Sequence, residues 1–287
     1  MKYIFLTFLL SIQSIFAQSD SVGNHRKWLV GSGTAALSVG SISVLASVWY
    51  DDYPKSAFHS FDDSQEWLQM DKLGHAYTAN FLTSSQYHAW KWAGMSKKKS
   101  LWLAGGISWS YLLGIEVLDG FNEEWGFSFS DLSANTLGTG LFIVQQQIWD
   151  EQRIHLKFGY RPSPFAELRP NTLGSNWSER LLKDYNAQSY WLAAAPTRFT
   201  NYNRFRWLQV AVGYSTHEKL FGLENSAVIN DFTYLAKREW ALGLDIDWSQ
   251  LPVKRPWMKK SLRVLNAVKV PLPALFWRGG TCYVGIL

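Results

Sequence analysis

Residues 71–80 read DKLGHAYTAN and place an acid, a base and an imidazole within five positions, before apolar and small residues follow. Asp71 and His75 are four residues apart, so they share one face if the segment is helical. An aspartate in a first turn favours a helix start, because a carboxylate suits the positive end of the helix dipole. The stretch therefore predicts a helix over about 71–92 that begins with Asp71, Lys72 and His75.

Two more polar motifs lie at the ends of other predicted helices. EVLD (116–119) closes a helix over about 97–118, and FSFSDLSANTLG (127–138) opens one over about 130–149. A charge-free run, residues 28–50, predicts a first helix that is long enough to cross a bilayer. The alternative for this run is a buried helix in a soluble bundle.

In a bundle of four helices that alternate in direction, the three polar motifs would lie at one end. We therefore expect candidate catalytic residues at His75, Glu116 and Asp131. The polar cluster around them would contain Asp71, Lys72, Asp119 and Asn135. His75, Glu116 and Asp119 are also candidate ligands for a divalent metal ion, since they offer one nitrogen and several oxygens.

Three interpretations of the function stay open. The favoured one is structural, because buried charges need partners whatever a protein does. The second is a metal-dependent or acid/base enzyme that acts on a lipid-linked envelope substrate. The third is an outer-envelope scaffold or assembly subunit, with membrane lipid or envelope proteins as partners.

The N-terminus predicts export. Lys2 precedes an apolar run over residues 4–12 and a small residue, Ala17, so residues 1–17 read as a signal peptide. Cys282 is the single cysteine, which excludes a disulfide framework. The chain therefore belongs in the periplasm or at a membrane.

The composition suits a membrane-associated or membrane-spanning protein of the α+β class. Charged residues make up 18% of the chain, below the roughly 25% of soluble domains. Residues 18–153 form the predicted four-helix bundle, and residues 154–287 form an aromatic, strand-rich region. There, residues 206–214 and 239–248 alternate as strands do, and residues 257–269 predict a basic amphipathic helix. We expect no nucleic-acid partner, despite the net charge of +5.

The predicted bundle has an acidic end, which carries the motifs, and a basic end. After signal cleavage, insertion of the first helix into the inner membrane would place the basic end outside. Cytoplasmic loops usually carry the excess of Lys and Arg, so this orientation is disfavoured. The outer membrane is therefore favoured over the inner membrane.

The three motifs together resemble an uncharacterised family of predicted periplasmic lipoproteins that includes the short protein YfiM, and more distantly the VanZ-type membrane proteins. The resemblance covers about residues 71–145. Residues 184–191 (DYNAQSYW) and 244–247 (LDID) look like the C-terminal extension of longer, Bacteroidota-type members. The resemblance implies an envelope location and no particular activity, and it does not extend to a lipid-bearing cysteine near the signal.

Overall fold

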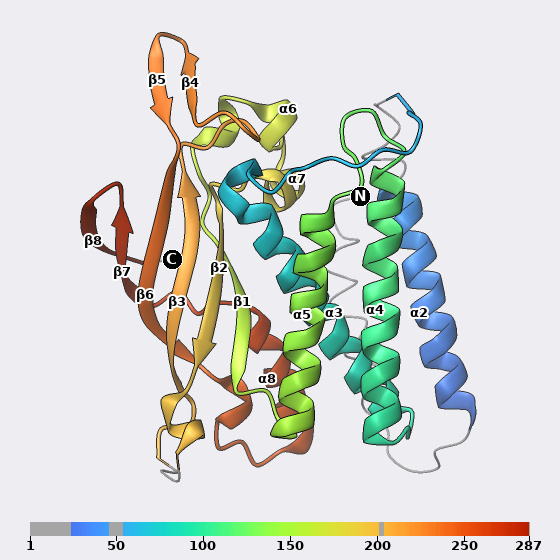
Figure 1. Ribbon diagram of the computed structural model, residues 1–287. Coiled ribbons are helices and arrows are strands. Elements are labelled where there is room, and N and C mark those ends of the chain that lie inside the picture. The colour runs from blue at the N-terminus through green and yellow to red at the C-terminus, as the bar shows by residue number, and fades with distance from the viewer. Residues whose placement is uncertain (1–23, 46–53, 201–203, 287) are drawn as a thin grey trace. The chain divides into compact units, whose positions relative to one another are not determined.

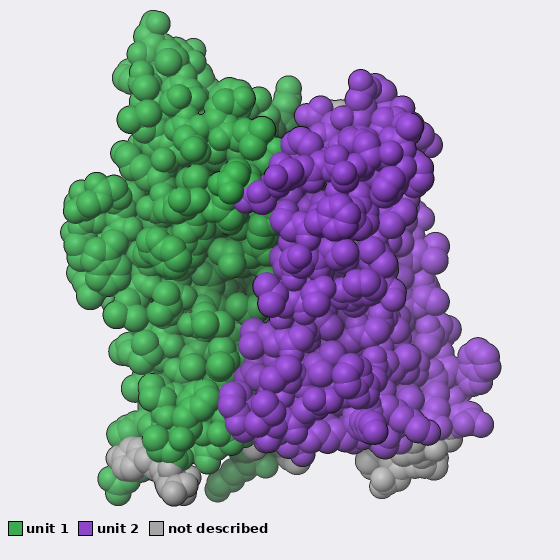
Figure 2. Space-filling model, in the orientation of Figure 1, with its two compact units in different colours: residues 1–5, 65–77, 151–287 green, residues 6–64, 78–150 purple. Residues whose placement is uncertain are grey.

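The computed structural model describes residues 24–45, 54–200 and 204–286. The predicted signal peptide and the end of the predicted first helix lie outside these residues. Helices occupy the N-terminal half and an antiparallel sheet the C-terminal part, which confirms the α+β class at this level. The described residues divide into two compact units (Figure 2): residues 65–77, 151–200 and 204–286 form unit 1, and residues 24–45, 54–64 and 78–150 form unit 2. The division falls inside one helix, α3 (Met70–Trp92).

Unit 2 is helical. Its helices are α2 (Asn24–Leu45), α4 (Lys97–Asp119), α5 (Phe129–Ile148) and the part of α3 (Met70–Trp92) that follows Tyr77. Side-chain caps set two of the starts, because Ser96 accepts from the Lys99 amide and Ser128 from the Asp131 amide. Tyr87 of α3, Leu101 and Ala104 of α4 and Phe142 of α5 form one core cluster. Val30 of α2 packs with Trp90 and Ala93 in another.

Among the described residues, α2 and α4 are long and apolar enough to cross a membrane, by length and composition. They differ in burial. Only 6% of the most apolar stretch of α2 is buried inside the protein, whereas 33% of the corresponding stretch of α4 is buried. The protein itself therefore covers little of α2.

Unit 1 contains a six-stranded antiparallel sheet with the strand order β1-β2-β3-β6-β7-β8 (Figure 1). They are β1 (Ile154–Tyr160), β2 (Gln188–Ala194), β3 (Leu208–His217), β6 (Lys237–Ile246), β7 (Pro273–Arg278) and β8 (Thr281–Ile286). β7 and β8 meet at Gly279 and Gly280, whose φ angles of 55° and 85° suit a tight hairpin turn.

Shorter elements connect these strands. The hairpin β4 (Ser226–Ile229) and β5 (Phe232–Leu235) lies between β3 and β6. The short helices are α6 (Pro170–Leu173), α7 (Trp177–Lys183) and α8 (Pro256–Val264). α8 coincides with the larger part of the basic helix predicted over residues 257–269, and it lies between β6 and β7 in the chain.

One side of the sheet, the inner face, buries small and aromatic residues. Its core cluster is Trp191, Ala193, Ala211, Ala241, Ala274 and Phe276. Gly213 lies opposite Trp191, and a Cβ built on this glycine would come within 2.6 Å of the indole ring. The glycine therefore lets the two strands keep a tryptophan between them.

The inner face also buries ion pairs. Lys157 and Asp245 are both 0% exposed, with Nζ and a carboxylate oxygen 3.2 Å apart, and Lys269 lies 3.7 Å from the other oxygen. Burial lowers the pKa of Lys157, and Asp245 opposes that shift. Such charges are tolerated inside a protein only when they are paired, so the three residues are a fixed part of the fold.

The outer face of the sheet is apolar and exposed. We call the outward side of β3, β6, β7 and β8 the apolar sheet face, which comprises Val210, Val212, Leu242, Leu244, Leu275 and Val284. Trp240 and Trp277 lie opposite each other at one border of this face. The sheet is therefore apolar on its exposed side and partly polar on its buried side, the reverse of a typical soluble sheet.

Candidate functional site

A left-handed turn leads into the DKLGH motif. Trp67, Leu68 and Gln69 have φ angles of 50°, 52° and 67° and lie in the short 3-10 helix η2 (Glu66–Gln69) directly before α3. Left-handed backbone costs a residue other than glycine roughly 1–2 kcal/mol. Three such residues in succession persist only when the surrounding structure holds them.

Unit 1 supplies the contacts that hold this turn. The Trp67 amide donates to the Gly222 carbonyl at 2.8 Å, and the Tyr214 hydroxyl donates to the Leu68 carbonyl at 2.6 Å. Arg238 donates to the side-chain oxygen of Gln69 at 2.6 Å. Because Tyr214 and Arg238 belong to strands β3 and β6, the sheet fixes the direction in which α3 begins.

Asp71 contacts three neighbouring side chains. Lys72 donates to one of its carboxylate oxygens at 2.8 Å, and the Tyr185 hydroxyl donates to the other at 2.8 Å. His75 lies one turn later, with Nε2 3.8 Å from Asp71. Burial on its own raises the pKa of Asp71, but the neighbouring charges of His75 and Lys72 and the hydrogen bonds outweigh it and hold the pKa below its usual value. Asp71 is therefore ionised at neutral pH.

Two further positions in the first turns of α3 contact the sheet region. A Cβ on Gly74 would come within 2.9 Å of the Tyr190 hydroxyl, so this position of the motif leaves space for a tyrosine of β2. The Tyr77 hydroxyl donates to the Ala267 carbonyl at 3.0 Å, and its ring packs near those of Phe158 and Tyr190. The start of α3 is thus fastened to unit 1 at several points.

The remaining predicted residues lie in unit 2, at the end of α4 and the start of α5. Glu116, Asp131 and Asn135 are buried, and Asp119 is half-buried. Ser128 caps α5 by accepting from the Asp131 amide at 3.0 Å. The three buried residues are therefore built into helix ends.

Asp63 also contacts the start of α5, although it lies outside the three sequence motifs. It accepts from the Ser128 hydroxyl at 2.6 Å and from the Ser130 hydroxyl at 2.5 Å. The signal was present in the serines of FSFSD (127–131), but nothing in the sequence shows which carboxylate they meet. Likewise, Tyr185 and Tyr190 lie in the 184–191 stretch noted for its resemblance, yet the sequence does not link them to Asp71 and Gly74.

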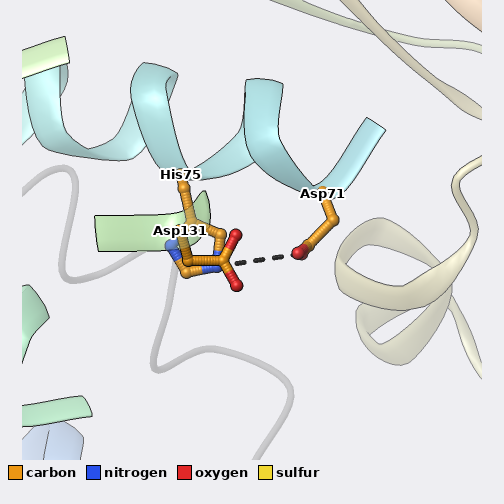
Figure 3. A group of neighbouring side chains, drawn as sticks. All are labelled: Asp71, His75 and Asp131. Carbon is orange, nitrogen blue, oxygen red and sulfur yellow. Dashed lines mark ion pairs between the residues drawn. The ribbon is translucent and has the colours of Figure 1, made fainter. Parts of the chain in front are cut away.

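Asp71 and His75 are candidate metal ligands that α3 itself brings together. The Nε2 atom of His75 lies 3.8 Å from a carboxylate oxygen of Asp71. Figure 3 shows the two residues on successive turns of α3, with their ion pair dashed. The other acidic candidates, Glu116, Asp119 and Asp131, belong to unit 2. An imidazole nitrogen and a carboxylate are donors that suit a divalent cation.

Comparison with known proteins gave one match. Residues 59–147 match the model of the family described as "Predicted periplasmic lipoprotein (DUF2279)". No curated protein and no solved structure matches the chain. The matched segment includes every predicted site residue, from Asp71 to Asn135, and supports an exported, periplasmic location. The relationships to YfiM and to the VanZ-type proteins stay predictions. The resemblance to the predicted periplasmic lipoprotein family is thus confirmed over residues 59–147.

Proposed function

We propose that this chain is a structural protein of the cell envelope, associated with the outer membrane, in which the DKLGH motif is an anchor and not a catalytic centre. The family match supports the envelope location. The outer membrane is favoured by the charge distribution along the predicted four-helix bundle, which is unsuited to the inner membrane. In this proposal, Asp71, Lys72 and His75 fix the start of α3, and Glu116, Asp119, Asp131 and Asn135 stabilise the ends of α4 and α5.

The observation that carries the proposal is the use of both Asp71 carboxylate oxygens. One accepts from Lys72 and the other from Tyr185, each at 2.8 Å. A catalytic base needs a lone pair directed at its substrate. Here, both carboxylate oxygens accept hydrogen bonds from residues of the same unit, Lys72 and Tyr185. Together with the close contact of Gly74 and Tyr190, this favours attachment over chemistry.

A double-mutant cycle with Asp71→Asn and Tyr185→Phe tests the anchor. Each variant is expected to lower the free energy of unfolding, and the double variant to lower it by less than the sum, because the two residues share one hydrogen bond. Unchanged stability in Asp71→Asn, combined with loss of an envelope phenotype or of a bound ion, would overturn the structural role.

Divalent-cation binding is a second candidate, favoured by the pairing of His75 with Asp71 on α3. One histidine is few for a zinc site, so an ion that prefers oxygen ligands is the better fit. Elemental analysis of the purified protein tests this candidate. His75→Ala should remove bound metal, whereas His25→Ala, which changes an exposed histidine of α2, should not. Equal metal content in the parent and both variants would exclude this role for His75.

A further inference from the structure

The apolar sheet face is continuous across four strands. Val212, Leu242, Leu275 and Val284 lie directly opposite one another in register, and all four are exposed. Trp240 and Trp277 form the neighbouring row. On β6, the outward positions from Trp240 to Leu244 are Trp, Leu and Leu, so the indole of Trp240 is the one outward side chain there with a hydrogen-bonding group.

This face is not the core of unit 1. The core cluster lies on the inner face, around Trp191 and Phe276. On the outer side, residues of unit 1 cover one end of the sheet, where the Tyr214 hydroxyl donates to the Leu68 carbonyl and the Tyr190 hydroxyl lies close to Gly74. The rest of the outer side therefore lacks a cover among the described residues of unit 1.

A basic segment lies at one end of the apolar sheet face. Residues 251–270 contain six Lys or Arg residues and no Asp or Glu, so the positive charge of this segment exceeds the net charge of +5 of the whole chain. Lys254, Arg255, Lys260 and Arg263 are exposed, as is Trp257. Because this segment joins the end of β6 to the start of β7, it lies beyond Leu244 and opposite the tryptophan row. The positive charge of this segment complements anionic headgroups, and tryptophan is enriched at membrane–water interfaces.

The size of the face distinguishes lying on a membrane from crossing it. Trp240 and Leu244 are separated by four residues of strand, or roughly 14 Å at about 3.4 Å per residue. A hydrocarbon core is about 30 Å thick, so the apolar rows match one leaflet at most. β8 also pairs only with β7 in the described sheet. An unpaired backbone edge is costly inside the hydrocarbon core, which argues against the sheet crossing the membrane.

A protein partner fits this face less well. Protein interfaces mix apolar residues with hydrogen-bonding groups and usually include Tyr, Arg or Met in their centres. Between the tryptophan row and the basic segment, the apolar sheet face offers aliphatic side chains without such groups. An apolar surface with tryptophans at one border and cations at the other resembles elements that lie in a membrane interface.

We propose that the apolar sheet face docks onto the acyl chains of one anionic leaflet, with the basic 251–270 segment at the headgroups. This inference goes beyond the proposed function, because it concerns a different surface from the DKLGH anchor. It does not depend on α2 or α4 crossing a membrane.

Depth-dependent fluorescence quenching tests the proposal. The full chain carries Cys282→Ser and a fluorophore on Val284→Cys, and is mixed with vesicles of equal parts phosphatidylcholine and phosphatidylglycerol whose acyl chains bear nitroxides. The label at Val284→Cys should lose most of its fluorescence. The same label on Asn171→Cys, an exposed position of α6, should lose little. Co-sedimentation with vesicles would not suffice, because α2 by itself could bring the protein to lipid.

Charge reversal provides the second arm. Lys260→Glu with Arg263→Glu should reduce the quenching at Val284→Cys, since both side chains are exposed and would repel phosphatidylglycerol. Quenching at Val284→Cys no greater than at Asn171→Cys would overturn the proposal. Self-quenching between labels on different chains without nitroxide quenching would also overturn it, and would assign the face to contact with a second copy.

Discussion

The two faces of the sheet in unit 1 differ in what they bury and what they expose. On the inner face, Lys157 and Asp245 are 0% exposed and paired. On the outer face, Leu242 is 41% exposed and Val284 is 70% exposed. Water would favour the opposite arrangement, because burying a Leu or Val side chain is worth roughly 1.5–3 kcal/mol. We infer from this difference that the inner face stabilises the fold, while the outer face is suited to surroundings other than water.

Helix α5 of unit 2 shows a similar arrangement. It buries the polar residues Asn135, Thr139 and Gln145, whereas Leu137 and Ile148 are 71% and 67% exposed. The two units are built from different secondary structure, yet both bury polar side chains and expose apolar ones. This likeness supports an apolar environment for both, which fits the envelope location of the matched family.

The largest effect is expected from breaking the inner ion pairs. Asp245→Ala leaves Lys157 and Lys269 buried without their shared carboxylate, and it should destabilise the protein by roughly 3–5 kcal/mol. Chemical denaturation in mild detergent measures this. Glu167→Ala, which removes an exposed partner 3.8 Å from Arg180, is the control and should change stability little. Equal effects of the two variants would contradict the role given to the inner face.

A smaller, pH-dependent effect is expected at Asp71. Asp71→Asn should cost about 1–3 kcal/mol at neutral pH, because it replaces a charged acceptor. The folded-state pKa of Asp71 lies below its ordinary value of 3.8, so the stabilisation is present above about pH 4 and is lost as the pH falls below it. Thermal melts at a series of pH values should therefore show the parent and the variant converging in acid. A difference in melting temperature between the parent and the variant that stays constant from neutral pH into acid would show that the charge of the Asp71 carboxylate does not provide the stabilisation.

The smallest effect on stability is expected from the outer face. Leu242→Ser should change the free energy of unfolding in detergent by less than about 0.5 kcal/mol, as exposed substitutions usually do. The same change should weaken attachment to vesicles, measured by flotation of the variant beside the parent. A loss of stability as large as that of Asp245→Ala would mean that the outer face belongs to the core.

The helices and the polar motifs could be predicted from the sequence for physical reasons. Ser128 and Asp131 mark the start of α5 by capping, and the spacing of Asp71 and His75 places them one turn apart. The left-handed turn at 67–69 could not be predicted, since none of its residues is Gly or Asn. Neither could the partners of Asp71, because Tyr185 is far away in the chain.

The sequence also could not predict which face of the sheet is buried. The alternation in 239–248 predicts a strand and shows that Leu242 and Leu244 share a face. It does not show which face is covered, and the usual rule would bury the leucines. Asp245 points inward because Lys157 and Lys269, from distant parts of the chain, meet it there. Only the assembled strands bring these three residues together.

The most direct test of the central claim compares two exposed positions in the same membrane-bound protein. In the Cys282→Ser background, Val284→Cys and Asn171→Cys are treated with a membrane-impermeant maleimide in intact vesicles. Both positions are exposed in the protein itself, so any difference comes from the surroundings. We expect much slower labelling of Val284→Cys, because lipid covers it. Equal labelling rates would contradict the claim that the apolar sheet face lies against a membrane.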